Sequence, residues 1–420
     1  MANVLVIGGG GREHALCWRL KQSPSVKQVF CSPGNGGIAE DVTCTQLKTP
    51  DAVIDFCKEK KIDLVVIGPE QPLVEGWADA LAVTGISIFG PSAKAARLEG
   101  SKGFMKSICN KYGIPTAAYG FFTDAKNAKK FVATHACPIV VKADGLAAGK
   151  GVIIAQTRKE ADVAIDDMFA GKIAGGKSVV IEEFLEGEEV SFFALGDGET
   201  AIEFGYAQDH KRAYDGDKGP NTGGMGAFSP PPIMTDALRR TVMQAIILPT
   251  MSAMKKEGCP FKGVLFAGLM LTKQGPKLLE YNARFGDPET QSLMMRFDGD
   301  LYQVLLACAQ GKLDKTKLSF SKKAAVCVVM AAKGYPGNYE KGSEIKGLDK
   351  AGKIDDVKIF HAGTEKRGNT IVAVGGRVLG VTALGDTIAG AQKKAYQAVD
   401  SIEWPKGFCR RDIGWRAIKN

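Results

Sequence analysis

Residues 1–100 alternate between short apolar strand-type segments and helical patterns, and no other feature constrains the fold as strongly. Strands separated by helices pair in parallel and are covered on both faces, so the alternation predicts a doubly wound parallel sheet. The strand-type segments are 4–7, 26–31, 64–67 and 86–89, and helical patterns begin at Arg12 and cover 52–60 and 73–83.

A run of glycines from Gly8 to Gly11 lies at the first strand-to-helix turn. Backbone N–H groups and a helix N-terminus point toward such a turn, which favours a phosphate there. The dinucleotide fingerprint is absent, because Glu13 replaces its third glycine and 31–33 (CSP) lacks a ribose-binding acid. A mononucleotide-sized phosphate, with Arg12 as a further anchor, is the favoured ligand. The alternative is that these glycines only allow tight packing of strand against helix.

Two further loops, 33–35 and 68–70, follow strands of the same sheet. Ligands of open α/β sheets bind beyond the carboxyl ends of the strands. We therefore expect Glu70 to contact a hydroxyl or amine group of a ligand.

The stretch KADGLAAGKGV, residues 142–152, resembles a nucleotide phosphate loop but does not match one. The Walker pattern needs one more residue between its glycines and a Ser or Thr where Gly151 stands. Apolar β-type runs at 138–142 and 152–155 flank it, which predicts a hairpin. Its small residues, with Lys142 and Lys150 at the ends, suit a cover over a nucleotide. A flexible surface turn is the other interpretation.

The rest of the chain mixes helices with antiparallel strands, and from about residue 326 it predicts a small α+β module. Helices are predicted at 126–135, 159–170, 236–256 and 386–401, strands at 178–184, 190–195, 201–207, 264–271, 277–282, 326–331, 357–360, 369–374 and 378–383, and a Gly/Pro-rich loop at 220–232.

Two acidic motifs are candidates for nucleotide and metal binding. In IEEFLEGEEVSFF (181–193), apolar residues bracket the acids. A strand end facing an adenine edge, followed by a ribose-binding carboxylate, accounts for this, and a solvated acidic face is the alternative. In LLEYNARFGDPET (278–290), Glu280 and Asn282 project from one face of a strand while Tyr281 points away. One carboxylate and one amide oxygen suit Mg²⁺; a half-buried polar strand end is the other reading.

Charged residues at 209–212 (DHKR) and the loop 219–230 complete the candidate site. Both signs of charge meet at one strand end, while His210 is assigned no proton-transfer role. The loop has four glycines, so its backbone can follow a ligand closely, and Asn221 is its most plausible side-chain contact. Arg284 suits a bidentate clamp on a substrate carboxylate, with Asp287 beside it.

Composition narrows the class of protein. The net charge of +9 is spread along the 420 residues without a basic stripe, which favours a phosphate-bearing small substrate over nucleic acid. The ten cysteines contain no C-x-x-C pair, which indicates free thiols in a reducing cytosol. We find neither a signal peptide nor an apolar run of membrane-spanning length, so we expect a cytoplasmic protein without membrane contact.

Taken in order, the motifs resemble those of the glycinamide ribonucleotide synthetase family in the ATP-grasp superfamily. The resemblance is carried by GGGGREHA (8–15), GPEQPLV (68–74), LEGSK (98–102), KADGLAAGKGV, EEFLEGEEVSF (182–192), AQDHKR (207–212), GPNTGGMGAFSP (219–230), EYNARFGDPET (280–290), HAGT (361–364), GGRVLGVTALG (375–385) and CRRDIGWRA (409–417).

The resemblance implies three domains and one reaction. An N-terminal Rossmann-like domain over 1–101, an ATP-grasp domain over 102–325 with a lid at about 122–189, and a C-terminal α+β domain over 326–420 are expected. The implied reaction phosphorylates glycine with ATP, and 5-phosphoribosylamine then attacks the acyl phosphate. Phosphoryl transfer of this kind depends on positioning and charge neutralisation rather than on a nucleophilic triad. A monomer or weak dimer is expected.

The resemblance also assigns residues to roles. Those implied for ATP are Lys102, Lys142, Gly149, Lys150, Gly151, Glu182, Glu183, Phe184, Leu185, Glu189, Arg212 and Asn221; those for Mg²⁺ or Mn²⁺ are Glu280 and Asn282; and those for the substrates are Gly10, Gly11, Arg12, Glu13, Asn35, Glu70 and Asp209. We predict Arg284, Arg212 and Asp287 as the catalytic residues, with Arg284 and Asp287 chosen for the glycine pocket from their residue types rather than from the resemblance.

One departure from the superfamily and three rival functions remain. Residues 266–271 (FAGLML) lack the third acidic metal ligand that many ATP-grasp enzymes carry, so phosphate and water must complete the shell. The nearest rival is another ATP-grasp ligase or carboxylase. A nucleotide-sensing module and an NAD-dependent dehydrogenase are the others.

Overall fold

The N-terminal residues form the predicted parallel sheet. In the computed structural model, which describes residues 1–147, 151–173 and 177–418, its strands lie in the order β3-β2-β1-β4-β5. Leu5 and Ile7 of β1 contact one core and Val4 and Val6 another, so both faces are buried. The elements are β1 (Ala2–Gly8), α1 (Gly11–Lys21), β2 (Val26–Pro33), α2 (Ile38–Asp41), β3 (Thr43–Cys44), α3 (Pro50–Lys60), β4 (Leu64–Ile67), α4 (Glu70–Val74), α5 (Trp77–Ala82), β5 (Ser87–Phe89) and α6 (Ala93–Gly100).

The single helix predicted over 73–83 is wrong. The structure has α4 and α5 there, separated at Gly76, whose φ of 84° lies in the left-handed region. Glycine adopts that conformation without a steric penalty, and it ends the helical geometry. Glu70 lies in the first turn of the short helix α4, directly after β4 at the carboxyl edge of the sheet.

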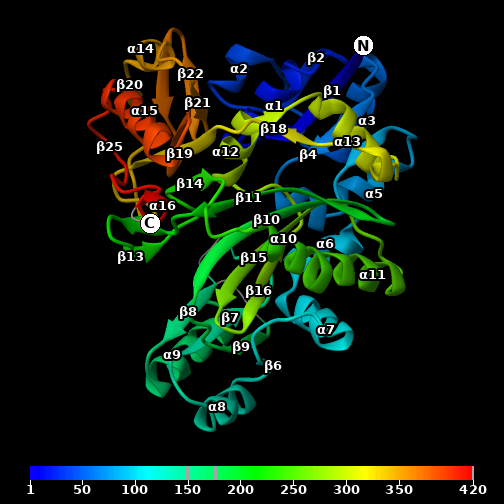
Figure 1. The fold of residues 1–420 in the computed structure, drawn as a ribbon, viewed down its shortest axis with the longest axis vertical. Helices are drawn as coiled ribbons and strands as arrows, with labels where there is room; N and C mark the ends of the chain where they lie inside the picture. The colour runs from blue at the N-terminus through cyan, green and yellow to red at the C-terminus, as the bar shows by residue number, and fades with distance from the viewer. Residues whose placement is uncertain (148–150, 174–176, 419–420) are drawn as a thin grey trace.

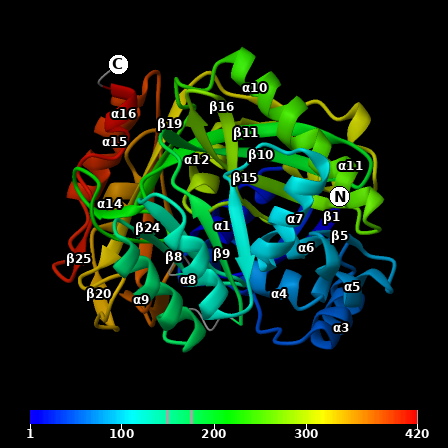
Figure 2. The ribbon, with the colours of Figure 1, turned by 90° about the horizontal axis from the view of Figure 1, so that it is seen from below.

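A small antiparallel sheet, the lid, follows α7 and has strand order β6-β9-β7-β8. Strand β7 pairs with β8 from Ile139↔Ala155 to Lys142↔Val152, so the predicted hairpin is confirmed. Helices α8 and α9 lie side by side on one face, where they bury the apolar residues of β7 and β9 (Figure 2). The elements are α7 (Lys102–Tyr112), β6 (Tyr119–Phe122), α8 (Ala125–Ala133), β7 (Ile139–Ala143), β8 (Val152–Ala155), α9 (Arg158–Phe169) and β9 (Val179–Glu183).

The longest sheet runs through the middle of the molecule (Figure 1). Its strand order is β16-β15-β10-β11-β14-β19-β24-β21, with β25 paired to β19. The elements are β10 (Glu188–Asp197), β11 (Ala201–Asp209), β14 (Gly226–Ser229), β15 (Lys262–Thr272), β16 (Gly275–Asn282), β19 (Ala324–Ala332), β21 (Val357–His361), β24 (Arg377–Gly385) and β25 (Gly407–Phe408).

The loop predicted at 220–232 contains strand structure, so that prediction is wrong in part. Strand β14 is fully buried between β11 and β19. Its four residues are too few for an alternating pattern, and its partner β19 is about a hundred residues away, so local sequence does not reveal it. The residues just before it pair as a hairpin of β12 (Arg212–Tyr214) with β13 (Lys218–Asn221).

The C-terminal α+β segment continues the central sheet. Strand β14 pairs with β19 through Gly226↔Val328. The expected boundary between the central and C-terminal domains, at residue 325, therefore does not interrupt the sheet. Helix α15 packs on β19 and β24. The remaining elements are α10 (Asp236–Val242), a π-helical turn (Met243–Ile247), α11 (Leu248–Lys256), α12 (Glu289–Arg296), β17 (Phe297–Asp298), α13 (Leu301–Ala309), a 3-10 turn (Leu313–Lys315), β18 (Ser319–Phe320), β20 (Ser343–Ile345), α14 (Leu348–Gly352), β22 (Thr364–Arg367), β23 (Thr370–Ala373), α15 (Ile388–Asp400) and α16 (Trp415–Ile418).

The structure also describes the state of the cysteines and the length of the helices. All ten cysteines are free thiols, as predicted. Within the described ranges, no helix is both long enough and apolar enough to span a bilayer.

Candidate active site

The lid meets the central sheet at strand β16. The Lys142 ammonium donates a hydrogen bond to the carbonyl of Leu279 at 3.3 Å, and Lys277 pairs with Glu183 at 3.1 Å. The backbone N–H of Leu278 also bonds to the carbonyl of Pro115, at 2.8 Å. Charged side chains from separate sequence motifs are thereby brought to one junction.

Glu280 lies among positive charges at this junction. Burial by itself raises the pKa of its carboxyl, but Lys211, Lys142, Lys102 and Arg284 outweigh that effect, and the pKa is lowered. The carboxylate therefore stays ionised in a partly buried place. A group of cations around one carboxylate is suited to hold an anionic ligand, whose oxygens could share a metal ion with that carboxylate.

Asn282 shares its face of β16 with Glu280, as the alternation of side chains predicts. Tyr281 between them is buried, and its hydroxyl lies 2.5 Å from that of Thr250. In the described part of the chain, no group of three or more His, Cys, Asp or Glu side chains could hold a metal. Mg²⁺ needs only one or two carboxylates when phosphate and water supply the other oxygens, so the pair of Glu280 and Asn282 fits it.

A buried triad of two lysines and one glutamate lies beside the junction. Glu182 of β9 forms ion pairs with Lys106 at 3.1 Å and with Lys142 at 2.9 Å, and all three side chains are nearly inaccessible to solvent. Burial lowers the pKa of Lys106, the charge of Glu182 raises it, and the net shift is downward. The carboxylate of Glu182 is therefore already committed to lysines.

A second set of charges surrounds Lys211. Its ammonium pairs with Glu189 at 2.5 Å. Burial lowers the pKa of Lys211, but Glu189, Asp209 and Glu280 raise it, and the net effect is upward. Burial raises the pKa of Asp209, and Lys211 only partly offsets this. The structure thus brings Asp209 and Glu189, predicted from different motifs, to one lysine.

The guanidinium of Arg284 is largely occupied by partners within the chain. It pairs with Glu70 and Glu99, each at 3.1 Å. It also donates to the side-chain oxygen of Asn282 at 3.2 Å and to the carbonyl of Phe285 at 3.1 Å. Three hydrogen bonds and the ion pair with Glu99 engage all three nitrogens of the guanidinium, so this arrangement orients Asn282 and Glu70 rather than offering a free bidentate clamp.

The N-terminal glycine turn lies against the segment after β16. Glu13 accepts the N–H of Gly10 at 2.7 Å and the Nε–H of Arg12 at 2.5 Å. Arg12 also donates to the carbonyl of Phe285 at 3.2 Å, and its backbone N–H to Asp287 at 3.4 Å. Gly11 and the side chain of Asp287 are neighbours. Predicted substrate and reacting-group residues are thus in contact across two domains.

The amide of Asn35 is used up by backbone groups. Its nitrogen donates to the carbonyls of Gly9 and His361 at 2.9 and 2.7 Å, and its oxygen accepts the N–H groups of Gly37 and Ile38. The side chain therefore shapes the loop. The predicted contact of Asn35 with substrate stays a prediction, and it would have to be made by backbone atoms.

The hairpin residues Arg212 and Asn221 face each other across the β12–β13 pair. Arg212 donates to the carbonyl of Gly219 at 2.8 Å.

At the lid, the Lys102 ammonium reaches the carbonyl of Gly145 at 3.3 Å, and Gly151 accepts the N–H of Ala143 at 2.8 Å. Gly149 and Lys150, which the sequence assigns to ATP, lie outside the described residues. After β9, Phe184 is exposed and Leu185 is buried.

Sequence reasoning missed several charged residues at this site. Glu99 accepts the N–H of Ala283 at 2.7 Å, and Glu289 accepts the hydroxyl of Ser191 at 2.9 Å. Arg377 donates to the carbonyls of Gly223 at 2.7 Å and Asp287 at 2.6 Å. Glu99, Glu289 and Arg377 lie within the motifs that carry the family resemblance, and that position could have indicated their role. Lys106, on an amphipathic helix, gave no such signal.

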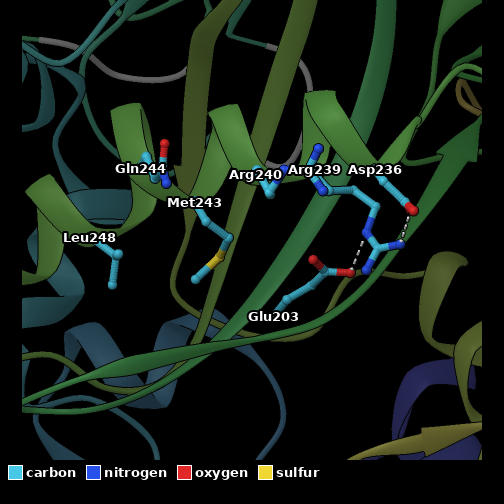
Figure 3. Close-up of a pocket in the computed structure, with 7 residues that line it drawn as sticks. All are labelled: Glu203, Asp236, Arg239, Arg240, Met243, Gln244 and Leu248. Atoms are coloured by element: carbon cyan, nitrogen blue, oxygen red, sulfur yellow. Dashed lines mark hydrogen bonds and ion pairs between the residues drawn. The ribbon is translucent and has the colours of Figure 1, made fainter.

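A surface pocket elsewhere does not compete with this site. It lies over α10 and β11, and none of the predicted site residues lines it (Figure 3). Its Arg239 is paired with Glu203 at 2.9 Å and with Asp236 at 2.8 Å.

A lid of antiparallel strands over a long antiparallel sheet, with lysines facing a carboxylate at their junction, is the arrangement of ATP-grasp proteins. Family models match residues 2–99, 100–290 and 325–416, described as the N domain, the ATP-grasp (A) domain and the C domain of phosphoribosylglycinamide synthetase. The chain belongs to the phosphoribosylglycinamide synthetase family.

Individual proteins agree with this assignment. A phosphoribosylamine–glycine ligase of Mesorhizobium japonicum is 57% identical over 99% of this chain and 98% of its own length. The crystal structure of the phosphoribosylamine–glycine ligase of Thermotoga maritima has a TM-score of 0.87 at 33% identity and covers 98% of this chain and 100% of its own.

A more distant structure shows the fold alone. Biotin carboxylase from Campylobacter jejuni, solved as a complex with β-γ-ATP, has a TM-score of 0.73 at 15% identity and covers 100% of this chain and 95% of its own.

Proposed function

We propose that this chain ligates glycine to 5-phosphoribosylamine with ATP, giving glycinamide ribonucleotide, ADP and phosphate in purine biosynthesis. Full-length relatives named phosphoribosylamine–glycine ligase support this, at 50–57% identity over nearly the whole chain. The structural observation that carries it is the Glu280 carboxylate, held ionised by three lysines and an arginine at the lid junction. That arrangement suits phosphoryl transfer from ATP.

The chemistry requires charge neutralisation more than a nucleophile. A carboxylate such as that of glycine becomes a good electrophile only after phosphorylation, and the transferred group carries charge that cations must offset. Lys102, Lys142 and Lys211 supply fixed positive charge for this. Glu280 and Asn282 would hold Mg²⁺ or Mn²⁺, which supplies further positive charge on the phosphates when bound.

The nucleotide base is assigned to the end of β9. Because the Glu182 carboxylate is committed to lysines, we place the adenine against the backbone of 183–185 and the side chains of Phe184 and Leu185. Glu189 is the ribose contact, in competition with its bond to Lys211. The grasp loop over 143–151 covers the phosphates, together with Arg212 and Asn221.

The ribose phosphate is assigned to the N-terminal glycine turn. Gly10 and Gly11 lie at the start of α1, where the helix dipole favours an anion, although the Gly10 N–H is donated to Glu13 in this structure. Arg12 and Glu13 are bonded to each other, which holds the turn open in one shape. Glu70, Asp209 and the backbone at Asn35 complete this proposed substrate site. Arg284 and Asp287 are proposed to shape the glycine pocket between the two substrates.

A phosphate-release assay tests the proposal. We expect turnover only when ATP, glycine and 5-phosphoribosylamine are all present. Release driven by bicarbonate without them would instead indicate the alternative, an ATP-grasp carboxylase or another carboxylate–amine ligase. NAD should give no thermal stabilisation, whereas a dehydrogenase would be stabilised by it.

We also propose a cellular location and an oligomeric state for the protein. We place it in the cytosol, as a monomer or weak dimer that binds small molecules and neither nucleic acid nor membranes. Sedimentation at several concentrations tests the oligomeric state.

A further inference from the structure

The hairpin of β12 and β13 needs support from outside itself. It forms a separate two-stranded sheet, and Lys218–Asn221 is exposed at every residue. An isolated two-stranded hairpin is only marginally stable in water. Yet this hairpin carries Arg212 and Asn221, which the proposed function places on the ATP phosphates.

The C-terminal residues supply that support through one buried arginine. Arg410 is 1% exposed. Its guanidinium bonds to both carboxylate oxygens of Asp412 at 2.8 Å, to Asp217 at 2.8 Å, and to the carbonyl of Arg212 at 3.1 Å. Every nitrogen of the guanidinium therefore has a partner, and two of the four bonds go to the hairpin.

Further bonds tie the turn of the hairpin to the same segment. Asp412 accepts the N–H of Gly216 at 2.8 Å, and Asp215 accepts the N–H of Arg411 at 2.8 Å. Arg416 pairs with Asp217 at 2.5 Å. The red C-terminal segment lies beside the green hairpin at β13 (Figure 1).

The same segment reaches the strand end that leads into the hairpin. The N–H of Gly414 donates to Nε2 of His210 at 2.9 Å, and His210 is completely buried. His210 stands between Asp209 and Lys211, whose charges act on one another and, through Lys211, on Glu280. The C-terminal segment therefore borders both the hairpin and the charged cluster.

Arg410 is the buried centre of this charge network, and the side chains of Asp217, Asp412 and Arg416 are partly exposed. A network built around one buried charge fixes one geometry more than it adds stability. Desolvation offsets most of the attraction within such a network, but removing one member leaves a charge unpaired. We propose that residues 410–416 are a clamp that positions the β12–β13 hairpin at the nucleotide, with Arg410 as its central positioning residue. This rests on the proposed function, which places the hairpin at ATP.

The neighbouring arginine provides a matched control. The Arg411 guanidinium pairs with Asp400 of α15 at 2.8 and 3.1 Å, away from the hairpin. Arg410→Met should weaken binding of a non-hydrolysable ATP analogue at least about tenfold and raise the KM for ATP, with little change in the KM for glycine. Arg411 bonds to the hairpin through its backbone N–H, and Arg411→Met keeps that N–H, so this variant should change none of these. Arg410→Lys should recover part of the loss, because it restores the charge but not the fork.

Hydrogen exchange tests the clamp without turnover. Arg410→Met should speed exchange of the backbone amides in 212–221, while those of β1 remain as in the unsubstituted protein. If Arg410→Met does not fold, Asp217→Asn, which keeps the side-chain shape, should show the same pattern more weakly. Unchanged exchange in the hairpin, or equal increases in KM for ATP and glycine, would overturn the clamp. An unsubstituted protein that fails to bind the nucleotide would instead refute the proposed function.

Discussion

Replacing Glu182 by glutamine should lower the free energy of unfolding of the lid far more than replacing its neighbour Glu183 by glutamine. Glu182 is 2% exposed and is the shared counter-ion of Lys106 and Lys142. Glutamine keeps the shape but removes the charge, so two lysines are left close together in a buried place. The charge of Glu182 also raises the pKa of Lys106 against the effect of burial, and that support is lost.

The two neighbours give different magnitudes from the same chemical change. Removing one member of a buried ion pair costs about 3–5 kcal/mol. Glu183 pairs with Lys277 at a site where the glutamate side chain is 44% exposed, and an exposed pair contributes about 0.2–1 kcal/mol. The loss of stability expected for Glu182→Gln is therefore at least about three times the loss expected for Glu183→Gln. Strand alternation, which turns one carboxylate inward and the next outward, is the cause.

Urea denaturation and nucleotide binding together measure this effect. Because the chain has several domains, the unfolding of the lid should be followed by hydrogen exchange in β7 and β9 rather than by one global signal. Glu182→Gln should also weaken ATP binding, since Lys142 loses its anchor. Equal losses for the two variants would refute the argument that burial of the triad sets the cost.

Three further predictions follow from the same contacts. Glu280→Gln should lower kcat at least about a hundredfold and abolish its dependence on divalent metal, measured by phosphate release; retained metal dependence would contradict this. Tyr281→Phe, on the opposite face of β16, should cost about 1 kcal/mol of stability in urea and leave the KM for ATP unchanged. Burial lowers the pKa of His361 to about 3. As pH falls below 6.5 the unfolded state alone takes up this proton, so stability should drop by about 1.4 kcal/mol per pH unit, and His361→Asn should remove that part of the loss between pH 7 and 5.

Local sequence patterns were sufficient to predict the structure where a segment's own residues determine its conformation. The parallel sheet follows from alternation of strand and helix, and the pairing of β7 with β8 follows from the two apolar β-type runs that flank the Gly-rich stretch. The placement of Glu280 and Asn282 on one face of β16 needs only the two-residue period of a strand.

Local patterns failed where the reason lies in a distant segment. Strand β14 exists because β11 and β19 lie on either side of it, and its own four residues give no period. The occupied guanidinium of Arg284 was also unforeseeable, because Glu70 and Glu99 belong to another part of the chain.

The sequence by itself determined the fold class, the order of the motifs and the family, because periodicity and residue spacing are properties of the linear chain. Only the tertiary structure decided which charges meet. A carboxylate's partners are set by distances of a few ångströms between segments that are tens or hundreds of residues apart. Glu182 therefore proved to be a counter-ion for two lysines, and Arg410 near the C-terminus proved to donate hydrogen bonds to the β12–β13 hairpin.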